Sequence, residues 1–516
     1  MKFKVIFLSF LFSSIFFANS VAQIKQPVRI EYDEDKVDDF EVSGFENKKV
    51  ALVIYRNKEI HSKKEKIYVF DSFDESFKKI NTKSIVVSGK WDKTTTFYNQ
   101  DFQFMLSYNH TNGKFLLIKI DPQTLDFTSL EGVFGKKFSV DEWYVQGNSL
   151  FVAGTVKKAA HVIVIDMNSG KVKDLMLKSM TKHKLTFIDL ERIKTPTGYE
   201  IGFQYQVQIK RKHHETYLLR FNENGEKTGD FLVLPKPDEK TDLMNATLTK
   251  VSNGTYIVTG TYSRGKTGFA NGVYVAGLTE TGLKFIKYYN FLDLHNFTNY
   301  MSERTQQVVE KRQDRKEAHG KELNIDYRTV THDILELDGT YIYLGEFYYP
   351  TYRTEYYTDF VTVASGPNGM TTTRAVQRTR KVFDGFQYSH AALAAFNDQG
   401  DLQWSNAFDM YVEDKPMRPK QFIHAGSDDA KIRLMYVTGS TIKAVTYDND
   451  GQETMKKEVG MNTNLNGDKI RYTLGGNCEY WFGNTFLSTG FQRIKNIEEE
   501  SDKKKRSVYF VNKLSF

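Results

Sequence analysis

The chain has 516 residues, of which 71 are Lys or Arg and 64 are Asp or Glu, and its formal net charge is +7 at pH 7. The two signs are interspersed along most of the sequence, which argues against the concentrated basic face of a nucleic-acid-binding protein. A single cysteine excludes an internal disulfide, and nine prolines are too few for a linker-rich or disordered chain.

The first 22 residues have the pattern of a secretory signal peptide. Lys2 and Lys4 precede an apolar stretch at 5–17, and small residues at 20 and 22 mark a cleavage site. The apolar stretch is shorter than the roughly 20 residues of a membrane-spanning helix, so we expect a mature chain that begins at Gln23 without a transmembrane helix. A lipid anchor needs a cysteine directly after the cleavage site, and the only cysteine is Cys478, far downstream, so we expect no lipid anchor. The predicted location is periplasmic, outer-membrane-associated or extracellular.

A strand followed by a polar turn recurs along the mature chain with a period of about 50 residues. Each turn comes directly after an apolar residue, and most contain the Asp, Asn or Gly that left-handed turn positions favour. Such small units must stack to bury their apolar faces, which is typical of a β-propeller. The predicted turns begin at Asp71, Asp121, Asp166, Asn222, Thr279, Asn397, Asp448 and Asn512.

The copy at 248–288 shows the repeat unit in full. Two strands flank the Asn253-Gly254 turn, and two more flank a turn that ends at Gly282. Four antiparallel strands with short connections make one propeller blade. We therefore expect residues 23–516 to form one all-β domain, an eight-bladed propeller of four-stranded antiparallel blades. Seven blades is the alternative, if the first or last copy is not a full blade.

The last copy is incomplete. Residues 506–512 form its third strand, and the chain ends at Phe516. Residues 27–32, near the mature N-terminus, form an alternating apolar strand that belongs to no copy. Pairing of the N- and C-terminal strands would cover two exposed strand edges, so we predict that it closes the ring.

Two insertions interrupt the period near the sixth copy. The first, at about 292–327, is charged and partly helical, with a narrow apolar face. That pattern is typical of a solvated helix or loop, and a partner-docking helix is the alternative. The second, at 349–386, predicts a projecting hairpin with its turn at 366–369.

The hairpin combines Tyr and Arg, which are enriched where proteins contact one another. The alternative is that it folds over the ring as a lid and that its tyrosines are merely packed. The candidate partner-binding residues are Tyr352, Tyr356, Tyr357, Arg374, Arg378 and Arg380.

Linear catalytic motifs are absent from the sequence. It contains no nucleophile elbow, no H-E-x-x-H zinc motif, no P-loop and no dinucleotide-binding glycine pattern. Cys478 has no His or Lys close in sequence, which favours a small buried side chain over a reactive thiol. We predict no catalytic residue, no cofactor and no metal site.

Two stretches carry a family resemblance. The sequences IDMNSGKV at 165–172 and FNDQGDLQW at 396–404 resemble the repeat of pyrroloquinoline-quinone-like and WD-repeat-like propellers, in which a turn with glycine leads to a docking tryptophan. Trp404 stands at that position. The resemblance implies a superfamily of quinoprotein dehydrogenases and of non-catalytic members, such as the propeller subunit of the outer-membrane barrel-assembly machinery. The dehydrogenases commonly carry adjacent cysteines over the cofactor, which this chain lacks.

Two classes of function follow. The first is a non-enzymatic propeller of the bacterial cell envelope that binds a protein, for example an outer-membrane complex, or a glycan, as a monomer or within a hetero-complex. The second is a glycan hydrolase, a lyase or a quinoprotein-like dehydrogenase whose groups converge on the central channel without a linear motif. Clustered titratable groups with shifted pKa values in the channel would favour the enzyme. A bland channel beside an exposed Tyr/Arg hairpin would favour the binding protein.

Overall fold

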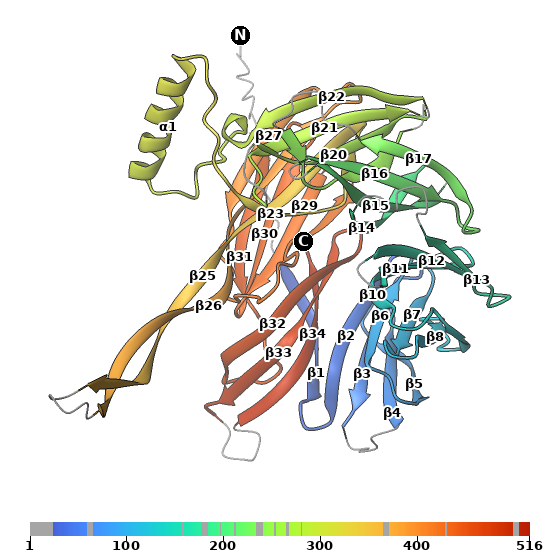
Figure 1. Cartoon of the computed structure of the whole chain (residues 1–516). Coiled ribbons are helices and arrows are strands. Elements are labelled where there is room, and N and C mark those ends of the chain that lie inside the picture. Colours follow the sequence, from blue (N-terminus) through green and yellow to red (C-terminus); the bar gives the residue numbers. More distant parts are fainter. Residues whose placement is uncertain are drawn as a thin grey trace, which may run out of the picture.

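The computed structural model describes residues 24–516 apart from 59–64, 157–158, 177–183, 197, 211–212, 234–240, 252–253, 265–267, 280, 365–370, 429–430 and 499–504. The predicted signal peptide lies outside the described residues. The described chain is almost entirely β-strand, in antiparallel sheets that follow one another along the sequence (Figure 1). None of its helices is long and apolar enough to span a membrane.

The first three sheets each consist of four strands consecutive in sequence, because short turns return the chain directly beside itself. They are built from β2 (Val37–Phe45), β3 (Val50–Asn57), β4 (Glu65–Phe73) and β5 (Lys79–Ser88); from β6 (Lys93–Tyr98), β7 (Gln103–Tyr108), β8 (Lys114–Ile120) and β9 (Phe127–Val133); and from β10 (Ser139–Gln146), β11 (Ser149–Val156), β12 (Ala159–Asp166) and β13 (Val172–Met176).

Two further four-stranded stretches form one larger sheet. They meet at a single parallel pair, Lys194 with Thr249, and β18 (Thr241–Leu243) pairs with the second stretch. The strands are β14 (Lys184–Thr195), β15 (Gly198–Lys210), β16 (His213–Phe221) and β17 (Lys227–Val233), followed by β19 (Thr247–Lys250), β20 (Tyr256–Arg264), β21 (Gly272–Thr279) and β22 (Gly282–Asn290).

The next sheet contains the long hairpin, and a four-stranded sheet follows it. Between β22 and this sheet lie η2 (Phe291–Asp293) and α1 (Glu303–Glu317). The strands are β23 (Arg328–Thr331), β24 (Leu335–Leu337), β25 (Thr340–Ala364), β26 (Thr371–Phe396) and β27 (Leu402–Asp409), then β28 (His424–Asp428), β29 (Lys431–Thr438), β30 (Thr441–Asp448) and β31 (Glu453–Gly460).

The last sheet contains strands from both ends of the chain. β32 (Asp468–Phe482), β33 (Thr485–Asn496) and β34 (Lys505–Ser515) are joined by β1 (Lys25–Asp33), which pairs antiparallel with β34 and places Ile30 opposite Val511. The Arg506 guanidinium holds the two ends together, with nitrogen–oxygen distances of 3.0 Å to Glu31 of β1 and 2.5 Å to Asp468 of β32. The terminal segments therefore lie side by side, in the pairing that the sequence predicted.

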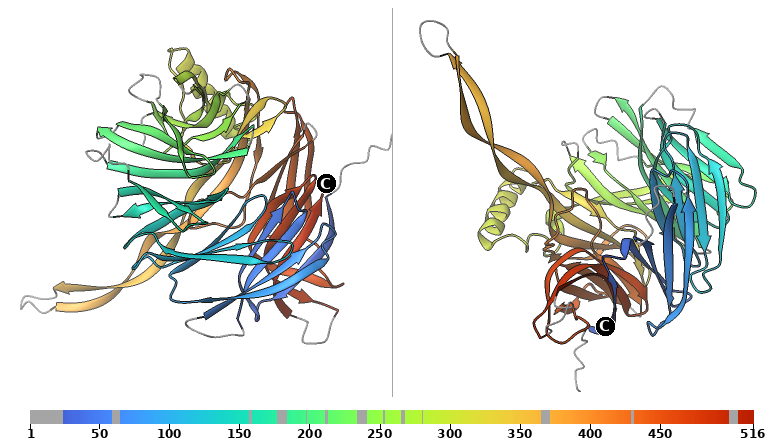
Figure 2. Two further views of the ribbon diagram at one scale, coloured as in Figure 1. Left: turned by 90° about the vertical axis from the view of Figure 1, so that its right-hand side faces the viewer. Right: turned by 90° about the horizontal axis from the view of Figure 1, so that it is seen from below.

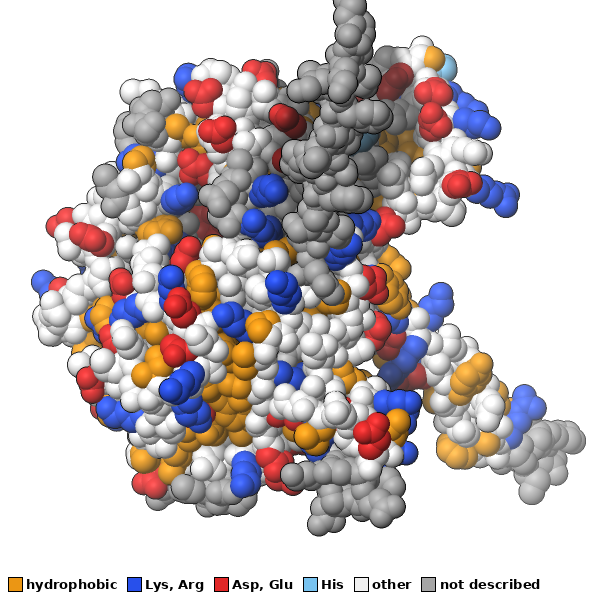
Figure 3. All heavy atoms as spheres, turned by 180° about the vertical axis from the view of Figure 1, so that it is seen from behind, with side chains coloured by type: hydrophobic (Ala, Val, Ile, Leu, Met, Phe, Trp, Pro, Cys, Tyr) orange, Lys and Arg blue, Asp and Glu red, His pale blue; other side chains and the backbone are white. Residues whose placement is uncertain are grey.

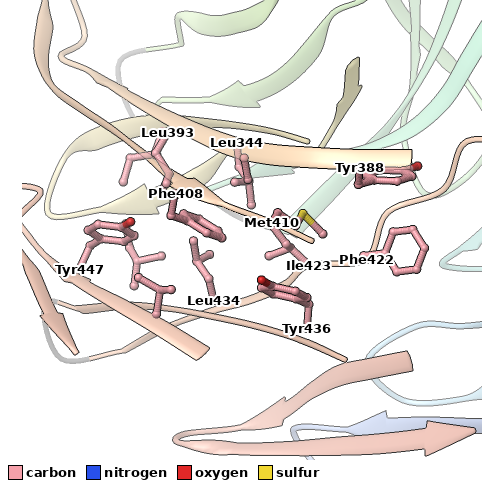
Figure 4. Packing of buried hydrophobic residues seen from close by; sticks show 14 of the residues in the cluster. Leu344, Tyr388, Leu393, Phe408, Met410, Phe422, Ile423, Leu434, Tyr436 and Tyr447 are labelled. Atoms are coloured by element: carbon pink, nitrogen blue, oxygen red, sulfur yellow. The ribbon is translucent and has the colours of Figure 1, made fainter. Parts of the chain in front are cut away.

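Apolar clusters lie between neighbouring sheets. Figure 4 shows the cluster in which Leu393 and Phe408 of one sheet pack against Leu434 of the next. Another joins the last sheet to the first, where Trp481 is 1% exposed and its Nε1 donates to the carbonyl oxygen of Val50 at 3.1 Å. Small sheets that stack in sequence around the molecule in this way form a β-propeller (Figure 2).

Several predicted turns are present, and two predictions are wrong. At Asp166 the carboxylate accepts the backbone N–H groups of Asn168 and Ser169 at 2.9 and 2.8 Å, which fixes the turn. Asp71 and Asn512, however, lie inside β4 and β34. Both are buried, and side-chain hydrogen bonds offset the cost of burying them, to Asp71 from the Tyr32 hydroxyl at 3.0 Å and to Asn512 from Arg29 at 3.5 Å. A polar residue after an apolar run therefore does not distinguish a turn from a buried polar network.

Some turn glycines are covered by the outer strand of the preceding sheet. Gly451 has φ +73°, and a Cβ atom there would lie 2.4 Å from the Trp404 ring. Gly400 has φ +75° and the same relation to the Phe285 ring, also at 2.4 Å. Trp404 therefore docks on the next turn as its position in the resemblance implies, and Phe285 takes the equivalent place one sheet earlier.

The first insertion is solvent-exposed at α1, and its buried side chains, among them Phe297 and Tyr327, lie before and after the helix. Ser302 caps α1, and none of the helical residues is buried. Outside the helix, Tyr300 stacks on one side of the His390 ring at 3.9 Å and Phe347 stacks on the other at 4.5 Å, measured between ring centroids. Burial lowers the pKa of His390 to about 3. The flanks of the helix thus fix the base of β25 and β26.

Candidate functional site

β25 and β26 extend beyond their sheet as a two-stranded ribbon, which we call the arm and define as residues 352–364 and 371–383 (Figures 1 and 2). Pairing runs from Tyr352 opposite Phe383 to Ala364 opposite Thr371. Seen from the other side, the arm carries hydrophobic and basic side chains along its length and stands clear of the rest of the molecule (Figure 3). The hairpin therefore projects and does not cover the propeller as a lid.

One face of the arm has no charged side chain except Lys381. Tyr352, Tyr356 and Phe360 occupy every fourth position of β25 and are 60%, 76% and 70% exposed. Alternate residues of a strand point to the same face, and directly paired residues share it, so Thr354 and Thr358 lie between these rings. We call this the aromatic face. Large exposed apolar groups in such a row mark an interaction site more often than a bare monomer surface.

The other face carries ion pairs. Glu355 accepts hydrogen bonds from Arg353 at 2.8 Å and from Arg380 at 3.0 Å, and these bonds lower the pKa of Glu355. Asp359 pairs with Arg378 at 3.0 Å. We call this the ion-pair face. Exposed pairs of this kind contribute little to stability, but they give both carboxylates of the ribbon a basic partner within the ribbon itself.

The predicted site residues divide between these two faces. Tyr352 and Tyr356 belong to the aromatic face, whereas Tyr357, Arg374, Arg378 and Arg380 belong to the ion-pair face. The prediction treated them as one Tyr/Arg surface, and the alternation of side chains along a strand separates them. Phe360 was not among the predicted site residues, although its four-residue spacing from Tyr356 would have placed it on the aromatic face.

A groove of about 600 Å³ lies where the arm leaves the propeller. The side chains of Met417, Tyr472 and Leu474 line it and are 65%, 48% and 50% exposed. Phe383 of the arm lines the same groove, and Lys415 pairs with Asp384 at its edge at 3.1 Å. Exposed apolar surface thus continues from the arm onto β32.

Acidic side chains gather at a second place, on the first strands of two consecutive sheets. The backbone N–H of Leu190 donates to Glu142 of β10 at 2.9 Å and to Asp189 of β14 at 3.0 Å, so the two carboxyl groups lie close together. Burial and the neighbouring Asp189 raise the pKa of Glu142 to about 8. Burial also raises the pKa of Asp189, and burial with Asp189 nearby raises that of Glu191. We call Glu142, Asp189 and Glu191 the inner acidic group.

Other buried acids are held by backbone donors. Glu346 accepts the N–H groups of Phe422 and Ile423, each at 2.9 Å, and its Oε1 lies 2.7 Å from His332 Nε2. Burial raises the pKa of Glu479 to about 7. Within the described ranges, no group of His, Cys, Asp or Glu side chains is arranged to hold a metal ion. The propeller therefore has clustered acids with shifted pKa values and also an exposed Tyr/Arg hairpin.

Cys478 is a buried free thiol on β32. It packs in the apolar cluster with Met435 and Phe486, and burial raises its pKa well above the usual thiol range. A thiol that stays protonated is a poor nucleophile, so this residue acts as a small core side chain.

Comparison with known proteins finds no protein-family model and no curated protein that matches the chain. Similar solved structures include the polysaccharide lyase Uly1, at 7% identity and a TM-score of 0.42 over 95% of this chain and 99% of that one. The Dos1 propeller is similar at 7% identity and a TM-score of 0.41, over 95% of each chain. The β-propeller domain of the Trilobed protease from Pyrococcus furiosus is similar at 9% identity and a TM-score of 0.34, over 81% of this chain and 98% of that one.

Proposed function

We propose that this chain is an exported, non-enzymatic β-propeller scaffold of the bacterial cell envelope that holds a protein partner through its arm. In this proposal the propeller has eight blades, and the pairing of β1 with β34 closes the ring. The four-stranded stretches and the packing of Trp481 against β3 support that count and that closure. The signal-peptide pattern before Gln23 supports export to the periplasm or beyond.

The observation that carries the proposal is the uncovered row of Tyr352, Tyr356 and Phe360. Full burial of a large apolar side chain contributes about 1.5–3 kcal/mol, and three in a row would supply a substantial part of a specific interaction. Aromatic residues are also the commonest energetic centres of protein interfaces. The ribbon holds these rings away from the body of the propeller, where a partner can surround them.

The experiment compares two variants of the mature chain. In the first, Tyr352, Tyr356 and Phe360 are replaced by Ala. In the matched control, Arg374, Arg378 and Arg380 are replaced by Ala, which changes the same number of residues on the ion-pair face of the same ribbon. Tagged chains are recovered from the native membrane fraction, and the proteins that co-purify in near-equal amount are identified.

We expect the native chain and the arginine control to recover the same partner, and the aromatic variant to lose it. Circular dichroism and melting temperature show whether each propeller is folded. An aromatic variant that is folded and recovers an unchanged set of proteins would remove the arm from the proposal.

The inner acidic group favours a second candidate, a glycan hydrolase or lyase. Glu142 and Asp189 share one backbone donor, and a carboxyl group with a raised pKa beside a second carboxylate is an arrangement used for general acid and base catalysis. The test is to incubate the native chain with a panel of bacterial and algal polysaccharides and to measure released reducing ends. Turnover that Glu142→Gln abolishes would establish the enzyme, and no turnover by the native chain would count against it.

A further inference from the structure

In the described part of the chain, no strand lies beside the outer edge of β25 in the arm. β23 pairs with β25 only as far as Tyr348, and β26 occupies the other side along the whole ribbon. From Tyr349 to Ala364, the described residues therefore provide no strand partner for the backbone groups that point away from β26. Pro350 stands at the base, and the residues beyond it are mostly aromatic or β-branched. An unprotected edge of this composition readily accepts another strand.

The opposite edge of the ribbon is protected by charge. Within the arm, β26 carries Arg374, Arg378, Arg380 and Lys381, and its acidic partners all lie on β25. Charged side chains on an edge strand discourage pairing with a further strand, and like charges that meet across strands are destabilising. β25 also carries charges, but Arg353, Glu355 and Asp359 are of both signs, so the arm is guarded along the β26 edge and open along the β25 edge.

The sequence of the open edge is nearly symmetric about Tyr356. It reads Tyr-Arg-Thr-Glu-Tyr-Tyr-Thr-Asp-Phe over 352–360. When a second copy lies antiparallel with Tyr356 opposite Tyr356, Arg353 faces Asp359 and Tyr352 faces Phe360. Opposite charges and aromatic pairs stabilise neighbouring strands when they face each other directly. A register centred on Tyr357 instead places Glu355 opposite Asp359, which is unfavourable because both side chains are acidic.

The length of the open edge of β25 also agrees with a register centred on Tyr356. In the register centred on Tyr356, Tyr349 of one copy faces Val363 of the other. Tyr349 is the first residue beyond the β23 pairing, and Val363 lies one residue before the end of β25. The pairing therefore uses the full open edge of both copies before β23 is reached.

We propose that two copies of this chain join through the β25 edges of their arms and form a four-stranded antiparallel sheet centred on Tyr356. A two-stranded ribbon is at best marginally stable in water, and additional strands with an apolar face stabilise it. Facing residues share a face, so the two aromatic faces lie on the same side of the joined sheet. The contact is isologous, as in a two-fold symmetric dimer. This dimer does not depend on the partner proposed above.

The register is tested with single cysteines. Facing Cα atoms in antiparallel strands are about 4.5–5.5 Å apart, a separation that a disulfide spans. Under mild oxidation we expect Tyr356→Cys to give a cross-linked dimer, because residue 356 faces its own counterpart. Thr354→Cys or Thr358→Cys alone should not, because each faces the threonine at the other position. A mixture of the two should cross-link. The native Cys478 is buried and does not compete.

The charge pairing is tested by sedimentation velocity over a range of protein concentrations. A contact made by one pair of β25 edges is small among specific interfaces. We therefore expect a dimer that dissociates on dilution in the micromolar range. Arg353→Asp should weaken it about tenfold, because two acids then face each other, and the exchange Arg353→Asp with Asp359→Arg should restore it. Arg374→Asp makes the same charge change on the guarded edge and should leave the dimer intact.

A native chain that remains monomeric up to about 100 μM, well above the micromolar range expected for a small interface, would overturn the proposal. So would equal disulfide yields at positions 354, 356 and 358, because that pattern indicates random collision. A monomeric Arg353→Asp chain that still recovers the proposed partner would show that the two proposals stand or fall separately.

Discussion

Tyr356 and Tyr357 are neighbours in the chain and lie on opposite faces of the arm. Tyr356 stands opposite Thr379 on the aromatic face and is 76% exposed. Tyr357 stands opposite Arg378, is 41% exposed, and its ring centroid lies 5.7 Å from the guanidinium carbon of Arg380. The two residues have the same side chain and are adjacent along the ribbon, but they lie on different faces. Comparing their variants therefore shows which face binds a partner.

We expect Tyr356→Ala to weaken partner binding by about tenfold or more, as for the central aromatic residues of other interfaces. Tyr357→Ala should weaken it less than about threefold, because that ring already packs within the arm. Biolayer interferometry with the recovered partner measures both dissociation constants. Equal losses for the two variants would contradict a partner that uses one face.

Trp481 joins the last sheet to the first, and its removal should destabilise the propeller. Trp481→Ala leaves a cavity beside Phe77 and Leu487 and removes the hydrogen bond to Val50, so we expect a loss of about 3–5 kcal/mol in the free energy of unfolding. Urea denaturation followed by tryptophan fluorescence measures it. Tyr411→Ala, at a side chain that is 61% exposed, should change the unfolding free energy little and serves as the control.

Glu142 should make the fold more stable at lower pH. Its pKa is about 8 in the folded chain and near 4.5 in the unfolded chain, so between these values the folded state binds more protons. Acidification from pH 8 toward pH 4.5 therefore stabilises the fold through this residue. On acidification over that range, the melting temperature of the Glu142→Gln chain should rise by several degrees less than that of the native chain.

Glu131→Gln, at an exposed position of β9, should keep the native dependence on pH. The comparison uses the change in melting temperature with pH and not its absolute value, so a general loss of stability does not confuse it. A Glu142→Gln chain with the native pH dependence would contradict the raised pKa.

His390 should have the opposite effect at lower pH. Its pKa is about 3 in the folded chain and near 6.5 in the unfolded chain, so the unfolded state binds more protons between these values. Stability contributed by the neutral ring is lost as the pH falls from 6.5 toward 3. His390→Phe keeps a ring between Tyr300 and Phe347 without a titrating group, and its melting temperature should fall less over this range, by several degrees. Scanning calorimetry at several pH values checks this, and parallel curves for both chains would refute it.

Local sequence patterns predicted the parts of the fold that depend on neighbouring residues. The strands β19 and β20, the projecting hairpin and the helical insertion all follow from short-range alternation and turn chemistry. The pairing of the two chain ends was predicted because each end contained a strand without a partner nearby. The number of blades stays a prediction, because sheets joined by a contact such as Lys194 with Thr249 are not separated by strand pairing alone.

Groups assembled from distant residues could not be predicted in this way. Glu142 and Asp189 meet only because their strands begin consecutive sheets, and neither belongs to a recognisable motif. Asp71 and Asn512 were misplaced for the same reason, since the side chains that bury them, Tyr32 and Arg29, lie far away in sequence. The two faces of the arm could have been predicted from the alternation of side chains along a strand. The prediction used only the Tyr and Arg composition of the hairpin.

The pairing of β1 with β34 also bears on how this protein reaches its native state. Val28 faces Lys513, so β1 cannot form this pairing until β34 has been synthesised. Bringing together segments so far apart costs chain entropy that only the finished contacts offset, which makes such steps slow. The sheets built from strands close in sequence can therefore form first, and the sheet that unites β1 with β34 would assemble last.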